Sequence, residues 1–380
     1  MLDNKNRMDA IIAVALVAVA IALPFLIDSR YVLGQVILAL FYACIASQWN
    51  LVFGFAGIFS LAPIAIFAIG GYATAMLCFF LGWSVWAALI PAALIAAVFS
   101  ILLGLACLRL SGVYVALLTL AVTQVMYLLI VTDTECFVRV GSVCRQFSGG
   151  AAGFSRFGDL GTRAWLRGDW IIGNYFIVCA LLAVIMIATW VISNGPAGLA
   201  FRAIRDNPGY AVARGINRFR VQLLVFGISA FFSGLAGGVY AAHFQVIGPT
   251  ILQLPQLMFI IAIVVIGGVG TFWGPLLGTA VLVGADELMR EAGEFRTLGL
   301  GIIIAAAIVL MPGGLAGALQ RIRRWTSTAD PRSDDRKQRL SVGYLILSVA
   351  AAWRKLRGMR RSARADVERI SPGRSPGAAG

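Results

Sequence analysis

The chain has 380 residues, of which 60% are hydrophobic and only 13% are charged. A water-soluble domain of this length could not bury so large an apolar fraction, so a soluble protein is excluded and an integral membrane protein is indicated. The formal net charge is +14, but the segment after residue 320 alone holds 15 Lys and Arg against 5 Asp and Glu. This uneven distribution argues against nucleic acid as a partner.

The first apolar run, residues 10–27, follows Lys5 and Arg7 as the core of a signal peptide would. It ends without a small-residue cleavage site, so we interpret it as an uncleaved membrane helix, with a signal peptide as the alternative. The further runs without a charged residue are 31–108, 110–132, 170–201, 221–285 and 297–320. Because a spanning helix takes about 20 apolar residues, they predict about three, one, one, three and one spans. We therefore expect an all-α polytopic membrane protein with about ten transmembrane helices.

The orientation follows from the short loops, because loops rich in Lys and Arg stay in the cytoplasm. Residues 193–220 carry five arginines and one aspartate, which predicts a cytoplasmic loop. Residues 286–296 carry four acidic residues and two arginines, which fits the outer side. Three crossings must separate these two segments, and the third must be short. The same rule predicts an outer loop at 133–169 and cytoplasmic N- and C-termini.

The C-terminal tail differs in composition from the rest of the chain. Residues 318–380 are rich in Arg, Ser, Pro and Gly, which is typical of disordered segments. We expect this basic tail to lie near anionic membrane lipids, with a docking segment for a partner protein as the alternative. The transmembrane permease domain is accordingly expected to cover residues 1–317.

The cysteines do not indicate a metal site. Four of the six lie in apolar runs, where a cysteine is usually a small hydrophobic residue, and none belongs to a metal-binding pattern. Cys136 and Cys144 both fall in the predicted outer loop and could form a disulfide in an oxidising compartment. Two unpaired thiols are the alternative.

The sequence offers no catalytic chemistry and no energy source of its own. No ionisable residue lies at mid-span, where a carrier coupled to protons or sodium would need one. There is no Gly-x-x-x-x-Gly-Lys-Ser/Thr loop to hold nucleotide phosphates. There is also no catalytic triad or carboxylate pair at membrane depth. We expect neither enzymatic activity nor a cofactor bound by this chain.

Glycines interrupt the apolar runs at two places that are similar to each other. Residues 54–63 and 267–275 share Gly-x-x-Gly-x-Phe followed by proline. Paired interruptions of this kind point to the place where a solute crosses, although any one glycine can instead serve close helix packing. Uncharged polar residues nearby could hydrogen-bond to a polar or zwitterionic solute. The pathway candidates are Gln48, Asn50, Gly54, Gly57, Ser60, Tyr114, Thr119, Gln124, Gly267, Gly268 and Gly270.

The predicted cytoplasmic loop should contain a short helix. Pro196 suits a first helical position, and 197–206 consists mostly of good helix formers before Asn-Pro-Gly stops it. A helix of about ten residues is not stable alone, so we expect it to lie against something else; arginines that only fix the topology are the alternative. The residues expected along one face are Leu199, Ala203 and Ile204, with Arg202 and Arg205 beside them.

Several stretches together match one family pattern. They are residues 198–207, 213–217 and 226–238, Asn50-Leu51 with Gly54 and Gly57, and residues 70–72, 108–114, 119–121, 267–275 and 311–315. Over roughly residues 10–317 the chain resembles the branched-chain amino acid ABC transporter permeases of the LivM type. Each piece alone is weak, but the whole string is specific.

The resemblance implies the architecture of an ABC importer permease in a bacterial inner membrane. Its partners would be a second related permease of the LivH type, two ABC ATPase subunits that bind the ATP, and a periplasmic solute-binding protein. In that family the cytoplasmic loop docks on the ATPase. Carried over by position, the docking residues are Arg202, Ala203, Ile204, Arg205, Asp206 and Asn207, with Arg214 and Gly215 behind them.

Three departures from the family pattern stand out. The chain has Ser60-Leu61-Ala62-Pro63 where Ser-Leu-Gly-His is usual, Pro208 where acidic residues are common, and a longer tail. The solute stays open, because relatives of this type move leucine, isoleucine and valine while similar permeases carry urea, short amides or other amino acids. A stand-alone facilitator and a membrane scaffold are the remaining alternatives.

Overall fold

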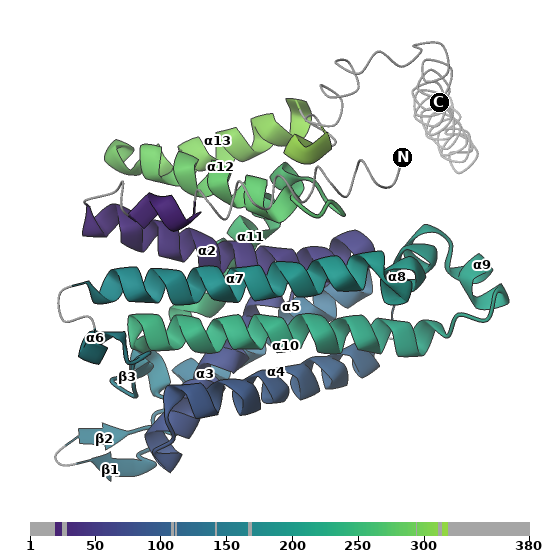
Figure 1. The fold of residues 1–380 in the computed structure, drawn as a ribbon. Helices are drawn as coiled ribbons and strands as arrows, with labels where there is room; N and C mark the ends of the chain where they lie inside the picture. Colours follow the sequence, from purple (N-terminus) through teal and green to yellow (C-terminus); the bar gives the residue numbers. More distant parts are fainter. Residues whose placement is uncertain are drawn as a thin grey trace, which may run out of the picture. The chain divides into compact units, whose positions relative to one another are not determined.

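The computed structural model describes residues 20–24, 29–107, 110, 112–140, 143–165, 169–293, 295–310 and 314–317. The described part is built almost entirely of helices, which confirms the all-α prediction for the membrane region (Figure 1). The predicted tail at 318–380 and most of the first apolar run lie outside these residues, so the predictions for them stay predictions.

Six of the described helices are long and apolar enough to span a membrane. They are α2 (Arg30–Asn50, continued by the π-helical turn η1, Leu51–Phe55), α3 (Pro63–Leu81), α4 (Val85–Cys107), α5 (Val113–Val131), α7 (Trp170–Asn194) and α10 (Arg218–Phe244). Three shorter apolar helices follow in the described part: α11 (Leu254–Gly267), α12 (Gly274–Leu288) and α13 (Phe295–Leu310). The apolar runs after residue 30 therefore divide into the numbers of helices that their lengths predict. In the run 221–285 the second helix, α11 (14 residues), is as short as the third, α12 (15 residues), although only the third crossing was expected to be short.

The loop at 133–169 holds small elements that the sequence did not predict. Strands β1 (Val138–Val140) and β2 (Val143–Arg145) form an antiparallel hairpin, followed by a 3₁₀ turn, η2 (Gly150–Ala152). Strand β3 (Phe154–Ser155) pairs with β4 (Val246–Ile247), directly after α10. This pairing places the loop and the turn after α10 on the same side of the helices. A single helical turn, α6 (Thr162–Trp165), leads into α7.

The structure shows that Cys136 forms a disulfide, but it does not identify the partner. Cys136 is disulfide-bonded, and Cys44, Cys78, Cys107 and Cys179 are free. The side chain of Cys144 lies outside the described residues, so the pairing of Cys136 with Cys144 stays a prediction.

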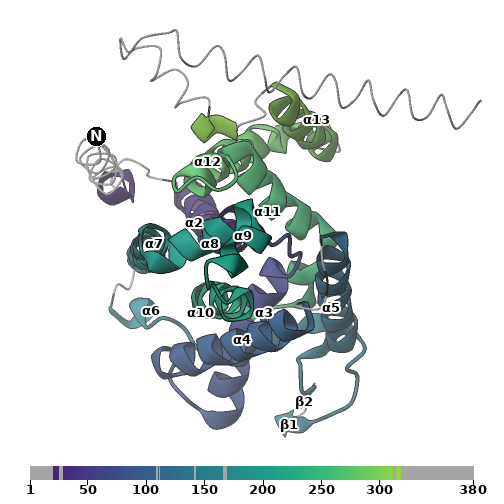
Figure 2. The ribbon, with the colours of Figure 1, turned by 90° about the vertical axis from the view of Figure 1, so that its right-hand side faces the viewer.

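Helices α3, α4 and α10 pack most closely, and glycines make this possible (Figures 1 and 2). Gly70 of α3 faces the backbone of Gly234 on α10, and a methyl group added at Gly237 of α10 would collide with the carbonyl oxygen of Phe67. Such backbone contact gains dispersion energy without needing a hydrophobic driving force, which helices in lipid lack. These glycines are structural.

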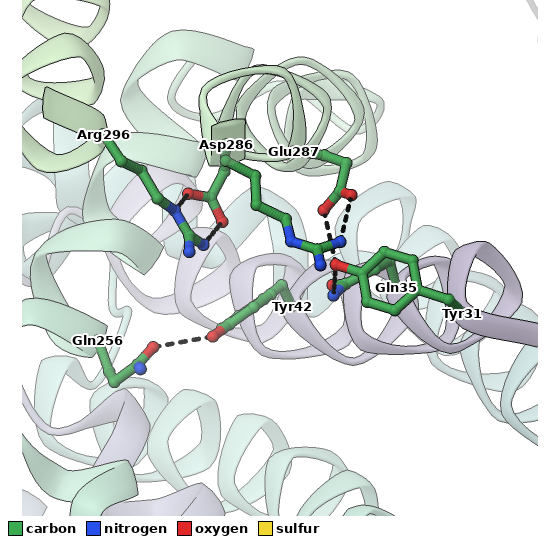
Figure 3. Close-up of polar contacts among 8 residues, drawn as sticks. Tyr31, Gln35, Tyr42, Gln256, Asp286, Glu287 and Arg296 are labelled. Atoms are coloured by element: carbon green, nitrogen blue, oxygen red, sulfur yellow. Dashed lines mark hydrogen bonds and ion pairs between the residues drawn. The ribbon is translucent and has the colours of Figure 1, made fainter. Parts of the chain in front are cut away.

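Helix α2 lies between two parts of the bundle. It packs against α7 and α10 on one side and against α12 and α11 on the other. Its first turn is fixed by polar contacts with the end of α12 (Figure 3). Gln35 donates a hydrogen bond to the Tyr31 hydroxyl (2.6 Å), which donates to Glu287 (3.1 Å). Arg290 lies over the Tyr31 ring at 4.2 Å and pairs with Glu287 at 3.3 Å.

The close contact at Gly237 gives a stability prediction. We expect Gly237→Ala to force α3 and α10 apart and to destabilise the protein by roughly 1–3 kcal/mol, the usual cost of overpacking. Gly284→Ala in α12 is the control, because a methyl group there meets nothing within 4 Å. Thermal unfolding of both variants in detergent checks this. Equal melting temperatures for the two would contradict the packing described.

Candidate functional site

The predicted cytoplasmic loop contains two helices rather than one. Helix α8 (Pro196–Asp206) starts at a proline and ends at Asn207, whose extended backbone breaks the helix. Asn207 then caps α9 (Pro208–Ala213), because its side-chain oxygen accepts a hydrogen bond from the Tyr210 amide at 3.0 Å. Pro208 therefore begins a new helix, for which its fixed φ and missing N–H are suited. Gly215, with a φ of 86°, turns the chain toward α10.

The inner face of α8 is apolar and packs on the membrane bundle. Phe201 is buried in a cluster with Phe55 of η1 and Phe226 of α10, and Ile204 is also buried. Leu199 points the other way and is 65% exposed. The prediction that Leu199 and Ile204 share a face is wrong, because five positions in an α-helix turn the side chain by about 140°.

Both arginines of α8 reach back to the bundle. Arg205 donates a hydrogen bond from Nη1 to the carbonyl oxygen of Gly54 at 2.6 Å, while its Nε pairs with Asp206 at 3.0 Å. Arg202 donates to the carbonyl oxygen of Ser193 at 2.7 Å, and its guanidinium lies 5.4 Å from the centre of the Phe55 ring. Guanidinium groups of this kind form strong, charge-assisted bonds to carbonyl oxygens. Helix α8 is thus tied to the ends of η1 and α7.

The two glycine breaks predicted from the sequence meet in space. Asn50 bridges them, since its side-chain oxygen accepts from the Gly270 amide (2.8 Å) and its NH₂ group donates to the Thr271 carbonyl (2.9 Å). A methyl group at Gly54 would collide with the Gly270 backbone. The breaks need glycine here because the two backbones touch. We name this contact of residues 50–57 with 267–271 the glycine junction.

Arg205 of α8 belongs to the glycine junction as well. Gly57 has a φ of 72°, and a Cβ atom there would lie 2.5 Å from the Arg205 Cγ. A Cβ atom at Gly270 would lie 3.2 Å from the Arg205 Nη1. The side chain of Arg205 therefore passes between the two breaks, where only glycine leaves room for it.

The other pathway candidates do not gather at one place. Gln48 donates to Thr189 of α7 at 3.2 Å, and Thr119 of α5 accepts from the Leu61 amide at 2.8 Å. The carbonyl of Ser60 accepts from the Trp49 indole at 2.6 Å. These bonds join α2 to α7, and join α2 and α5 to the segment before α3. The remaining candidates are Tyr114, which is 66% exposed, Gln124, whose buried NH₂ group has no partner among the described residues, and Gly267, which packs on Gly274 and Gly278 of α12.

A polar pair inside the bundle was not among the pathway candidates predicted from the sequence. The Tyr42 hydroxyl donates to the side-chain oxygen of Gln256 at 2.8 Å (Figure 3). Both residues line a cavity of about 90 Å³ between α2, α3, α10 and α11, together with Tyr240 and Thr250. The criterion that selected Gln48, a polar residue within an apolar run, would also have selected Tyr42 and Gln256.

The contact between Gly57 and Arg205 is testable by itself. We expect Gly57→Ala to displace the Arg205 side chain and loosen α8, which raises amide hydrogen exchange over residues 196–206. Gly82→Ala is the matched control, because Gly82 has a similar φ of 66° but nothing within 4 Å of an added methyl group. Hydrogen exchange followed by mass spectrometry distinguishes the two. Unchanged exchange at α8 in the Gly57 variant would show that the contact does not hold the helix.

Comparison with known proteins places most of the chain in one family. The sequence model of a family described as the permease component of branched-chain amino acid transport systems matches residues 31–312. The match includes α8, α9 and both glycine breaks. No solved structure matches the chain.

Individual relatives agree with the family match. The high-affinity branched-chain amino acid transport system permease protein LivM of Escherichia coli (strain K12) is 30% identical over 336 residues, covering 83% of this chain and 76% of that protein. LivH of Salmonella typhimurium is 24% identical over 42% of this chain and 56% of its own length. The ribose import permease protein RbsC of Haemophilus influenzae is 26% identical over 41% of this chain and 50% of its own length. These relatives are transport subunits, not enzymes.

Proposed function

This chain belongs to the family of permease components of branched-chain amino acid transport systems, and we propose that it forms part of the solute pathway of an ATP-driven importer. Its apolar helices make it a multi-pass membrane protein. In this proposal it lies in a bacterial inner membrane with both termini in the cytoplasm. Work arrives from two separate ATPase subunits, because the sequence has no phosphate-binding loop of its own.

The observation that carries the proposal is the outer face of the loop. Leu199, Tyr210 and Val212 are 65%, 59% and 54% exposed, whereas Phe201 and Ile204 of the same loop are buried. Large apolar side chains that are exposed on a polar loop indicate contact with another protein. In transport systems of this family, the ATPase is the partner expected on the cytoplasmic side.

Not all of the predicted docking residues face outward. Among the residues carried over by position, Ile204 packs inward, and Arg202 and Arg205 bond to the bundle. The ATPase would therefore touch Leu199 and Tyr210 with Asp206, which is 66% exposed. The two arginines would carry the movement inward, from α8 to the glycine junction.

A second permease of the LivH type would complete the pathway. LivH proteins resemble this chain over 42% of its length, so the two kinds of subunit share a common fold. The polar pathway candidates in the described part of this chain are spread over several helices and do not line one cavity. A pathway between two related permeases fits this distribution.

Amino acids are the solute class that the relatives favour. The resemblance to LivM covers 83% of the chain, against 41% for the ribose permease. We propose branched-chain or other amino acids, delivered by a periplasmic solute-binding protein. The alternatives, urea or a short amide, fit the same architecture.

Purification of the tagged chain from mild detergent, with mass spectrometry of what accompanies it, tests the proposal. We expect a second permease and ATPase subunits to be recovered. Leu199→Glu should reduce ATPase recovery roughly tenfold or more, since loss of a central apolar contact costs about 1–2 kcal/mol. Val246→Glu is the control, because Val246 is 47% exposed but lies in β4, after α10. A chain that purifies alone would favour a stand-alone facilitator.

The role of Arg205 is separable from docking. Arg205→Gln removes a charge-assisted hydrogen bond worth about 1.5–3 kcal/mol while leaving the outer face of α8 intact. We expect this variant to retain the ATPase but to lose roughly tenfold in ATP-driven leucine uptake in proteoliposomes. Arg220→Gln, which alters an exposed arginine at the start of α10, should transport normally. Normal uptake by the Arg205 variant would remove the glycine junction from the coupling route.

A further inference from the structure

A pocket of about 180 Å³ lies behind α8, on the side away from the proposed ATPase surface. Its walls come from residues 56–59 after η1, the end of α4, the start of α5, α8, the start of α9 and the first third of α10. Figure 1 shows α8 and α9 at the end of the bundle where α10 begins. The pocket shares Gly57 and Arg205 with the glycine junction, but Arg218 and Gln222 have no role in the transport proposal.

The pocket is positively charged. Arg205 and Arg218 line it, and no Asp or Glu is among the described residues of its walls. Arg205 is partly neutralised by Asp206. Arg218 makes no ion pair or side-chain hydrogen bond with any described residue. A guanidinium on a partly apolar pocket attracts an anion and suits a carboxylate or phosphate.

An amide beside Arg218 adds an uncharged polar group to the pocket. Gln222, one turn after Arg218 on α10, is only 8% exposed, and its side chain lines the pocket. Its amide forms no hydrogen bond within the described part of the chain. The amide atoms of Gln222 are not among the buried polar atoms without a partner, so they are open to water or to a molecule in the pocket. The amide offers both a donor and an acceptor.

The remaining walls are apolar. Ile58, Val115 and Phe226 face the same space, with Cys107 and Leu110 beside them. A ligand that satisfies both halves of the pocket has an anionic head for Arg218 and Gln222 and a small apolar body for these side chains. A fully polar anion would leave the apolar wall uncovered.

We propose that this pocket binds a small carboxylate with an apolar body from the cytoplasmic side, of the same class as the transported amino acid. Two parts of this inference rest on the proposed function: that the pocket opens to the cytoplasm, and that its ligand belongs to the transported class. The carboxylate pairs with Arg218, the amide of Gln222 takes a second polar group, and the apolar body packs on Val115 and Phe226. Since Ile204 and Arg205 form one wall, a bound ligand holds α8 against the bundle. Imported solute that accumulates in the cytoplasm would thereby restrain α8, which is proposed to contact the ATPase.

The test is binding to the full chain in nanodiscs of zwitterionic lipid. The probes are leucine, isovalerate, which keeps the carboxylate and the apolar body, and isoamylamine, which lacks the carboxylate. We expect saturable binding of leucine and isovalerate by calorimetry, and none of isoamylamine. Arg218→Gln should weaken binding at least tenfold, or about 1.4 kcal/mol. Arg220→Gln, two residues along and outside the pocket, should bind as the native chain does.

A second variant distinguishes a loss of binding from a folding defect. Gln222→Glu keeps the size of the side chain but adds a negative charge, so it should abolish carboxylate binding while the protein elutes as the native chain does. The proposal is overturned if neither carboxylate binds, or if Arg220→Gln loses as much affinity as Arg218→Gln. It is also overturned if the chain responds only to phosphatidylglycerol in the nanodisc, which would make the pocket a lipid site.

The binding test and the purification test can fail separately. A chain that recovers its ATPase but binds no carboxylate refutes the pocket alone. A chain that binds isovalerate through Arg218 but purifies alone refutes the importer alone.

Discussion

The structure depends on one hydrogen bond, from the Arg205 guanidinium to the carbonyl oxygen of Gly54 at 2.6 Å. The carbonyls just before Gly54 accept bonds from the amides of residues 56–58, so Gly54 is the next carbonyl at a helix end, where the chain itself supplies no donor. Arg205 reaches it only because Gly57 has no side chain in the way. Asn50 then joins this end to the second glycine break. One side chain of the loop is thereby connected to both interruptions of the membrane helices.

This connection gives the loop two faces with different tasks. The outward face, with Leu199 and Tyr210, is apolar and open to another protein, while Phe201 and Ile204 fix the helix to the bundle. A force applied to the outer face reaches the glycine junction through a packed core and a short charge-assisted bond, neither of which stretches easily. Glycine breaks are the natural place for such a force to act, because their backbones are least restricted by side chains. A permease without its own energy source can therefore still be driven.

The sequence predicted those features that depend on local composition. The division of the apolar runs into helices and the helix that begins at Pro196 follow from hydropathy and from proline and glycine placement. The two similar glycine breaks were also visible, but not that they touch, because that contact joins residues more than 200 positions apart. The hydrogen bond from Arg205 to the Gly54 carbonyl was not predicted, since a charged side chain in a short loop is expected to bond only to water; 37% of this side chain is indeed exposed. The opposite directions of Leu199 and Ile204 could have been predicted from helical geometry alone.

Distance measurement between spin labels in the assembled importer tests the coupling most directly. With labels at Ala213 in the loop and Val269 in the second break, each paired with a label at Ile90 on α4, ATP binding should change both distances. With Arg205→Gln, the distance from Ala213 should still change and the distance from Val269 should not. A loop that moves in the native protein while Val269 stays at a fixed distance from α4 would contradict the account.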